Sequence, residues 1–116
     1  MSIPNAPIPN APSPGGPIQD QIAYWNNEAG ACWVARQESQ DVTLAPVGAA
    51  AFERAGIRPG ESVVDIGCGC GTTTVELARR VGEAGRVLGI DVSRPMLARA
   101  RERTRAMANV TQVEAD

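Results

Sequence analysis

The feature that most constrains the fold of this chain is a run of three alternating glycines directly after a short apolar segment. The segment, Ser62–Ile66, is rich in β-branched residues and is typical of a short strand buried in a parallel sheet. Gly67, Gly69 and Gly71 then allow a sharp backbone turn and a close approach of a ligand to the backbone. Such a loop leads into a helix whose free N–H groups can receive a carboxylate or a phosphate. Both kinds of ligand therefore remain open at this point.

The residues after the loop alternate between helix and strand patterns. Thr72–Val81 is predicted to be a helix, and residues 86–90 a second strand. Ser93 is expected to open a further helix and Asn109 to end it, and Val110–Glu114 starts a third strand. The order strand, helix, strand, helix, strand predicts an α/β fold, the first half of a Rossmann-like, doubly wound parallel sheet.

Two segments of different texture precede this part of the chain. Residues 1–17 hold six of the nine prolines, so we expect a disordered or extended arm without regular backbone hydrogen bonds. Residues 18–58 have helical spacing of apolar residues and predict two or three helices, the last capped by Asp41 and ended by Gly56. Residues 59–116 then form the sheet-containing domain.

The glycine spacing distinguishes between the ligand classes that use such loops. A dinucleotide fingerprint has glycine at the first, third and sixth positions, and here the sixth position is Thr72. A phosphate-binding P-loop would need Gly-Lys-Ser/Thr, which is absent after these glycines. Instead, Asp65 precedes the loop by one spacer, and Asp91 lies at the end of the second strand. A carboxylate at that strand end can accept hydrogen bonds from both hydroxyls of a ribose.

On the run Asp-Ile-Gly-Cys-Gly-Cys-Gly at 65–71 and the later Asp91, the sequence resembles the class I S-adenosylmethionine-dependent methyltransferases. The resemblance covers about residues 57–116 and is closest to the small-molecule enzymes of ubiquinone and menaquinone biosynthesis. It implies S-adenosyl-L-methionine as cofactor, with Asp65 near the methionine portion and Ala115 and Asp116 near adenine. The full set that it implies for cofactor binding is Asp65, Gly67, Cys68, Gly69, Gly71, Asp91, Val92, Ala115 and Asp116.

The resemblance also implies a function and an expectation about completeness. The expected function is methyl transfer from the cofactor to a small-molecule acceptor, with this chain supplying the cofactor-binding half. Family members have about seven strands, so three predicted strands imply a truncated chain with little or no activity of its own. The alternatives are a module that binds the cofactor without turnover or, less favoured, a nicotinamide- or flavin-dependent oxidoreductase.

No catalytic residue can be assigned from the sequence. The chain has no histidine, so a general base, if one is needed, would be Tyr24, a carboxylate or a residue outside this chain. Tyr24, Trp25 and Trp33 either shape an acceptor pocket or pack in the core, and both interpretations stay open. Cys32, Cys68 and Cys70 are expected to be reduced thiols, and a metal site is not expected.

Charge and hydropathy limit the expected partners. The net charge of −2 provides no strong field for nucleic acid, and no apolar run reaches the roughly 18 to 20 residues of a membrane span. We therefore expect a cytoplasmic protein whose partner is a small molecule, with no contact to nucleic acid or membrane. Five arginines on the helix that Ser93 opens are interpreted as its solvated outer face: Arg94, Arg99, Arg101, Arg103 and Arg105.

Overall fold

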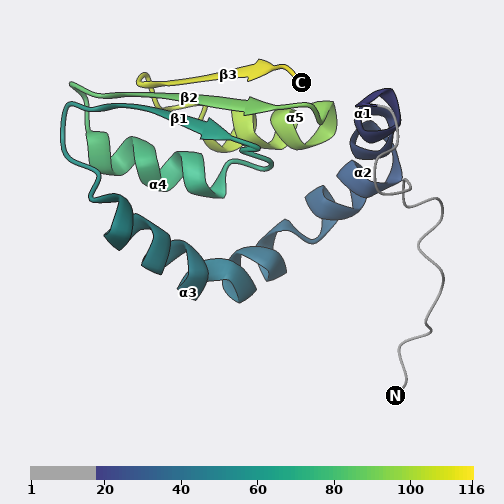
Figure 1. The fold of residues 1–116 in the computed structure, drawn as a ribbon, viewed down its shortest axis with the longest axis horizontal. Coiled ribbons are helices and arrows are strands. Elements are labelled where there is room, and N and C mark those ends of the chain that lie inside the picture. The colour runs from purple at the N-terminus through teal and green to yellow at the C-terminus, as the bar shows by residue number, and fades with distance from the viewer. Residues whose placement is uncertain (1–17) are drawn as a thin grey trace.

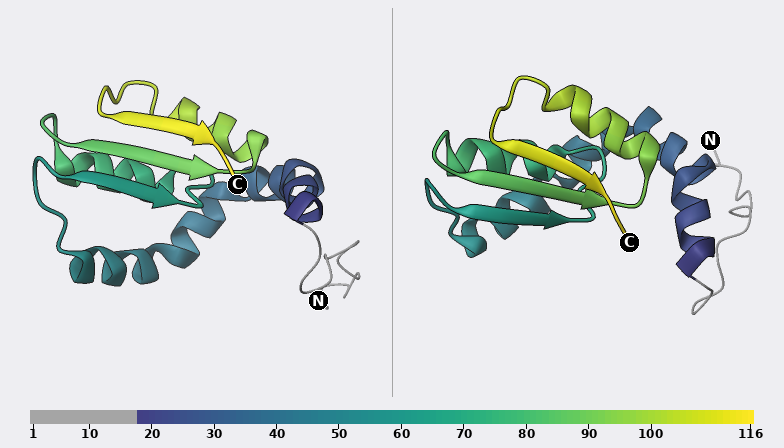
Figure 2. Two further views of the ribbon diagram at one scale, coloured as in Figure 1. Left: turned by 45° about the horizontal axis from the view of Figure 1, so that its top comes forward. Right: turned by 90° about the horizontal axis from the view of Figure 1, so that it is seen from above.

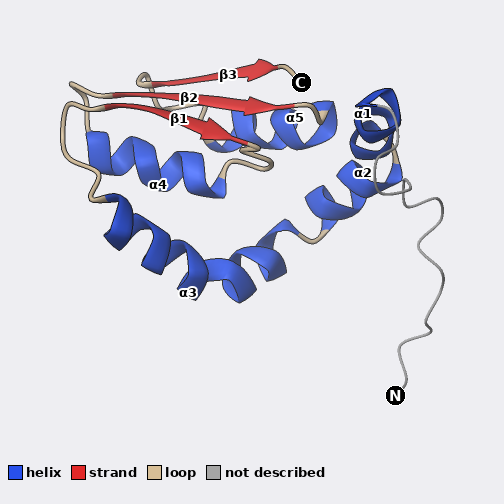
Figure 3. Cartoon of the chain, viewed as in Figure 1, coloured by secondary structure: helices blue, strands red, loops and turns tan. Residues whose placement is uncertain are grey.

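A computed structural model of the chain describes residues 18–116, where an N-terminal group of helices leads into a small parallel sheet (Figures 1 and 3). The proline-rich arm expected at residues 1–17 lies outside the described residues. The elements follow in the order α1 (Ile18–Asn26), α2 (Glu28–Ala35), α3 (Gln37–Ala55), β1 (Ser62–Ile66), α4 (Thr72–Val81), β2 (Arg86–Asp91), α5 (Arg94–Arg103) and β3 (Val110–Glu114).

The three strands form one parallel sheet in the order β1-β2-β3. Val63 of β1 lies opposite Val87 of β2, which in turn lies opposite Val110 of β3. Figures 1 and 2 show α4 and α5 against the same face of the sheet. Each helix joins one strand to the next parallel strand, as a βαβ unit requires. The predicted α/β architecture, with helices before the sheet, is confirmed.

The core lies between the sheet and α4. Leu77, Ala78 and Val81 of α4 and Val87 of β2 form a buried cluster, and Val81 is fully buried. Burying a side chain such as leucine or valine stabilises a fold by roughly 1.5–3 kcal/mol. The partly buried residues that pack against this cluster are Phe52, Ile57, Val63, Met107 and Val110.

β1 is more exposed within the described residues than its β-branched composition alone predicts. β1 lies at the edge of the sheet and pairs only with β2. Its side chains alternate between the two faces, and those of Val64 and Ile66 are 55% and 83% exposed. The physical reason is that α4 and α5 cover one face of the sheet, while no element within residues 18–116 covers the other.

Helix α5 is shorter than its sequence predicts. It begins after the N-cap Ser93, as expected, but ends at Arg103 rather than at Asn109. The Asn109 side-chain amide instead donates to the carbonyl oxygens of Ala78 and Gly82, at 2.9 Å each. These carbonyls lie at the C-terminal end of α4, where each also accepts a backbone hydrogen bond, from the amides of Gly82 and Gly85. Asn109 therefore connects the start of β3 to the end of α4.

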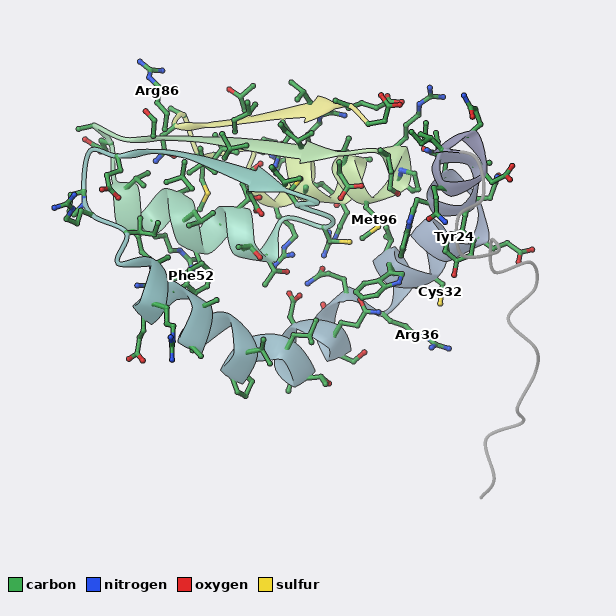
Figure 4. The ribbon with its side chains drawn as sticks, in the orientation of Figure 1. Tyr24, Cys32, Arg36, Phe52, Arg86 and Met96 are labelled. Atoms are coloured by element: carbon green, nitrogen blue, oxygen red, sulfur yellow. The ribbon has the colours of Figure 1, made fainter. Side chains whose placement is uncertain are left out.

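Helix α3 also begins earlier than expected, because its N-cap is Arg36 and Asp41 lies inside the helix. The carboxylate of Asp41 points away from the helix backbone toward partners on α4 and α5. The other end agrees with the prediction, since Gly56 is in the left-handed conformation with φ 60°. Near that end Phe52, labelled in Figure 4, packs on the core. The guanidinium of Arg80 lies 4.9 Å from the centroid of its ring.

Helices α1 and α2 are attached where β2 runs into α5 (Figure 2). The Asn26 side-chain amide donates to the carbonyl of Val92 at 2.7 Å, and the Ser93 hydroxyl donates to the carbonyl of Trp25 at 2.6 Å. A Cβ at Gly30 would lie 2.2 Å from the carbonyl oxygen of Trp25 and 2.8 Å from the Ser93 hydroxyl oxygen. The close approach therefore requires glycine there. Within residues 18–116, no helix is long and apolar enough to cross a membrane.

Candidate functional site

The glycine loop between β1 and α4 is held against the carboxyl end of β2. The amides of Gly67 and Cys68 both donate to the carbonyl oxygen of Ile90, at 2.8 and 3.0 Å. Gly67, Gly69 and Gly71 all have positive φ, at 73°, 53° and 86°. L-residues with side chains rarely adopt such angles, which accounts for glycine at the alternating positions.

Asp91 is the residue that fastens this loop. Its Oδ2 accepts a hydrogen bond from the Gly69 amide at 2.7 Å, and its Oδ1 accepts one from the Ser93 amide at 2.8 Å. The carboxylate thus joins the glycine loop to the start of α5. An ionised carboxylate has about four lone-pair positions, so two such contacts leave capacity for further donors.

Asp65 lies at the base of the same loop with a different environment. Its Oδ2 accepts a hydrogen bond from the hydroxyl of Thr74, which is fully buried, at 2.7 Å. Burial raises the pKa of the Asp65 carboxyl above its usual range, the Thr74 hydrogen bond partly opposes this, and the charge of Asp91 adds to it. Asp65 thus lies at the base of the loop, where its carboxylate accepts a hydrogen bond from Thr74 of α4.

An open cleft of about 680 Å³ lies at the carboxyl ends of the strands, between the sheet and helices α1 and α2. It brings together five of the nine residues predicted to bind cofactor: Gly67, Asp91, Val92, Ala115 and Asp116. The other four, Asp65, Cys68, Gly69 and Gly71, do not line it. The rest of the lining consists of Trp25, Trp33, Ile66, Ile90 and Met96.

Sequence reasoning missed three of these lining residues. Ile66 and Ile90 lie at the carboxyl ends of their strands, where parallel sheets bind ligands, and that position is the signal that could have identified them. Met96 lies in the first turn of α5 (Figure 4), and no local pattern distinguishes it from a core residue. Trp25 and Trp33 do line the cleft, with ring centroids 6.3 Å apart, whereas Tyr24 packs edge-on against Trp25.

The cleft wall is apolar and acidic. Among the described residues that line it, Asp91 and Asp116 are the charged side chains, and none is cationic. Carboxylates accept hydrogen bonds from hydroxyl or amine donors and attract positive charge. The wall thus suits a ligand with hydroxyl groups and a cationic centre.

The loop cysteines are buried thiols with low reactivity. Burial is the largest cause of a rise in the pKa of Cys68 to about 11, and the charges of Asp65 and Asp91 add to it. Burial also raises the pKa of Cys70. All three cysteines are free. In the part of the chain that the structure describes, no three His, Cys, Asp or Glu side chains are grouped to hold a metal.

The interpretation of the arginines as a solvated outer face holds only in part. Arg94, Arg101 and Arg105 are exposed, but Arg103 is only 21% exposed and donates to the Cys70 carbonyl at 2.9 Å. The physical reason is that α3 lies beside this part of α5 and supplies acceptors from Gln37 and Asp41. The sequence pattern of one helix could not reveal a partner helix about sixty residues away.

Comparisons with known proteins identify chains that resemble this one. Residues 63–116 match the family described as methyltransferase domain. Demethylmenaquinone methyltransferase of Staphylococcus aureus is 43% identical over 61 residues, which cover 53% of this chain and 25% of that protein. The chain thus matches a quarter of the length of this curated relative.

Two solved structures share the fold. Protein-L-isoaspartate O-methyltransferase is similar over 60% of this chain and 23% of its own, with 30% identity and a TM-score of 0.57. Coclaurine N-methyltransferase bound to N-methylheliamine and S-adenosylhomocysteine is similar over 62% and 22%, with 31% identity and a TM-score of 0.56. Together with the glycine loop and Asp91, these matches show that residues 63–116 belong to the class I S-adenosylmethionine-dependent methyltransferases.

Proposed function

We propose that the cleft binds S-adenosyl-L-methionine and that the protein transfers its methyl group to a small-molecule acceptor. The observation that carries this proposal is the pairing of Asp91 with the glycine loop at the cleft edge. The carboxylate is held in place by two backbone amides, so little order would be lost when it binds a ligand.

The residues present fit the cofactor. A Cβ added at Gly67 would have no atom within 4 Å, so the loop backbone is open to a ligand at this glycine. The free lone pairs of Asp91 would accept hydrogen bonds from the ribose hydroxyls. Ala115 and Asp116, at the end of β3, would lie beside adenine, and Val92 next to Asp91 would line the same wall. These assignments rest on the cleft lining and the family resemblance.

The bound cofactor would supply an activated sulfonium methyl group, whose carbon–sulfur bond breaks as the carbon–acceptor bond forms and whose sulfur keeps the bonding electrons. The protein's part would be to hold the acceptor in line and to exclude water. Trp25, Trp33 and Met96 provide the apolar surfaces for this. Asp91 already accepts two hydrogen bonds, and we therefore assign it to binding and not to proton removal.

A small acceptor is supported by the size and charge of the cleft. Its volume of about 680 Å³ lies in the range of small-ligand pockets, roughly 300–1,000 Å³. The acidic wall disfavours a polyanion such as nucleic acid. We further propose that residues 18–58 form a helical segment that borders the acceptor side, while residues 59–116 form the cofactor-binding domain.

Two measurements test the proposed function and separate it from its alternatives. Calorimetric titration with S-adenosylmethionine and with NAD distinguishes a methyltransferase from an oxidoreductase. Tighter binding of NAD would refute the proposal. Mass spectrometry of a panel of phenols, quinols and amines incubated with protein and cofactor then detects methyl transfer. Binding without transfer to any of them, or to components of a cell extract, would instead favour a module that binds without turnover.

A further inference from the structure

A second polar cluster holds the far end of the glycine loop, away from the cleft. The Asp41 carboxylate of α3 accepts hydrogen bonds from the Thr72 hydroxyl, from the Gln37 amide at 2.6 Å and from Arg103 Nη2 at 3.0 Å. Arg103 Nη1 of α5 donates to the carbonyl oxygen of Cys70 at 2.9 Å and to the Thr72 hydroxyl at 2.8 Å. One guanidinium thus contacts the loop, the start of α4 and helix α3 together.

This ion pair is the least exposed of those in the described residues. The side chains of Arg103 and Asp41 are 21% and 27% exposed, whereas those of Arg80 and Glu76, the next least exposed pair, are 36% and 35% exposed. Exposed pairs are screened by solvent and contribute little, while less exposed charge-assisted hydrogen bonds are stronger and more directional. The Arg103–Asp41 pair is therefore suited to fixing the position of the groups that it contacts.

The two halves of the loop are fixed by separate sets of groups. Ile90 and Asp91 of β2 hold the first half, through the amides of Gly67, Cys68 and Gly69. Arg103 and Asp41 hold the second half, through the Cys70 carbonyl and the Thr72 hydroxyl. Between them, Gly71 has φ 86° and lies so close to α5 that an added Cβ would be 3.0 Å from the Cβ of Ala100. The loop path is thus determined from both ends.

We propose that Asp41 and Arg103, here called the loop latch, are positioning residues that set the loop geometry for cofactor binding. The latch makes no hydrogen bond to a residue of the cleft lining and acts through Cys70 and Thr72. The inference rests on the proposed function, because it concerns the affinity of the same cleft. It makes helix α3, which lies outside the cleft, a determinant of cofactor affinity.

Arg99 supplies a matched control for a purely structural role. It also lies on α5 and connects to α3, through a hydrogen bond from its Nε to Gln37 Oε1 at 3.1 Å. Its remaining hydrogen bond is with Glu102 on its own helix, and it makes no hydrogen bond to the loop. Loss of Arg99 therefore weakens the contact between α3 and α5 and reaches Asp41 only through Gln37, while the hydrogen bonds to Cys70 and Thr72 are kept.

The test measures the affinity of the 116-residue chain for S-adenosylhomocysteine by calorimetry, beside its melting temperature. Arg103→Gln is expected to weaken binding about tenfold or more, and Arg99→Gln by less than about twofold. Arg103→Lys should give an intermediate affinity, because an ammonium keeps the charge but not the forked geometry. Equal losses for Arg103→Gln and Arg99→Gln would overturn the latch. A wild-type chain that binds no cofactor would instead refute the proposed function.

If Arg103→Gln does not fold, Thr72→Val provides a second test of the loop latch. Thr72 is exposed, and valine has nearly the same shape without the hydroxyl that joins Asp41 to Arg103. The neighbouring exposed Thr73 provides the control variant Thr73→Val. We expect Thr72→Val to weaken binding by about threefold or more while Thr73→Val leaves it unchanged. Equal affinities of the two variants would overturn the latch.

Discussion

The amide of Gly69 donates a hydrogen bond to the carboxylate of Asp91 at 2.7 Å, which joins the middle of the glycine loop to the end of β2. Both residues were predicted to bind the cofactor directly, but only Asp91 lines the cleft. Gly69 instead faces α5, where an added Cβ would lie 2.9 Å from the Cε of Met96. We therefore expect this glycine to position the carboxylate and the loop relative to each other, and its direct contact with the cofactor stays a prediction.

Replacement of Asp91 should affect both stability and affinity. Asp91→Ala leaves the amides of Gly69 and Ser93 without their acceptor and should lower the free energy of unfolding by about 1–3 kcal/mol. It should also weaken S-adenosylmethionine binding about tenfold to a hundredfold. Chemical denaturation and calorimetry measure the two effects, with the exposed Glu83→Ala as control. An unchanged dissociation constant for Asp91→Ala would remove Asp91 from the binding site.

A side chain added at Gly67 should block the ligand. It should not clash with any other part of the fold. Gly67→Ala and the control Gly56→Ala both place alanine at positive φ, 73° and 60°, with no atom within 4 Å of the new Cβ. Each should lose about 1–2 kcal/mol of stability through left-handed strain. Only Gly67→Ala should weaken cofactor binding in a calorimetric titration. Equal affinities of these two variants would place the ligand away from the loop backbone.

Gly69 should also lose stability on gaining a side chain, and Met96 should respond to the change. Gly69→Ala places a Cβ 2.9 Å from Met96 Cε at a φ of 53°, so the flexible end of Met96 must shift, at a modest cost added to about 1–2 kcal/mol of backbone strain. Truncation of the partner should relieve part of this cost, so Met96→Ala and Gly69→Ala should be non-additive in thermal denaturation. Strict additivity in the double variant would show that the two side chains do not meet.

Asn109 should contribute to stability although it lies in a loop. Asn109→Ala removes hydrogen bonds to the carbonyls of Ala78 and Gly82 and should lower the free energy of unfolding by about 1–3 kcal/mol. The control is Asn27→Ala, which removes one exposed hydrogen bond to Ala23 and should cost less than about 0.5 kcal/mol. Urea denaturation of both variants measures the two losses of stability. Similar midpoints for the two variants would contradict a stabilising role of Asn109.

Thiol labelling should reveal the raised pKa of Cys68. Only the thiolate reacts, so below its pKa of about 11 the Cys68 labelling rate should rise about tenfold for each pH unit. Burial should slow the reaction further, whereas the exposed Cys32 serves as an internal reference in the same sample. Iodoacetamide labelling followed by peptide mass spectrometry gives both rates. Labelling of Cys68 as fast as Cys32 at about pH 8 would contradict the buried, acid-flanked environment.

The sequence was most informative where local rules decide the structure. The glycine loop, the helix start at Ser93 and the left-handed Gly56 follow from backbone sterics and capping, and each was predicted. The sheet order follows from the alternation of strands and helices. Five of the predicted binding residues reach the cleft for the same reason, because they lie at carboxyl ends of parallel strands.

The features that were missed depend on contacts between distant segments. Asp41 is of a residue type that often caps helices. Its partners Thr72 and Arg103 can be identified only once α3 is known to lie beside α5. Asn109 was expected to end a helix, and it instead bonds to carbonyls of another helix. Met96 reaches the cleft because the loop passes over α5. No periodicity within one segment contains this information.

The close contact at Gly30 means that the cleft can be opened from a distance. With a Cβ site only 2.2 Å from the carbonyl oxygen of Trp25 in α1 and 2.8 Å from Pro95 and Ser93 at the start of α5, any side chain at this position would push α2 away from both. It would displace the helix that carries Trp33, and it would also press on Ser93, whose amide bonds to Asp91. One added methyl group would thereby move the wall of the cleft that carries Trp33 relative to the glycine loop.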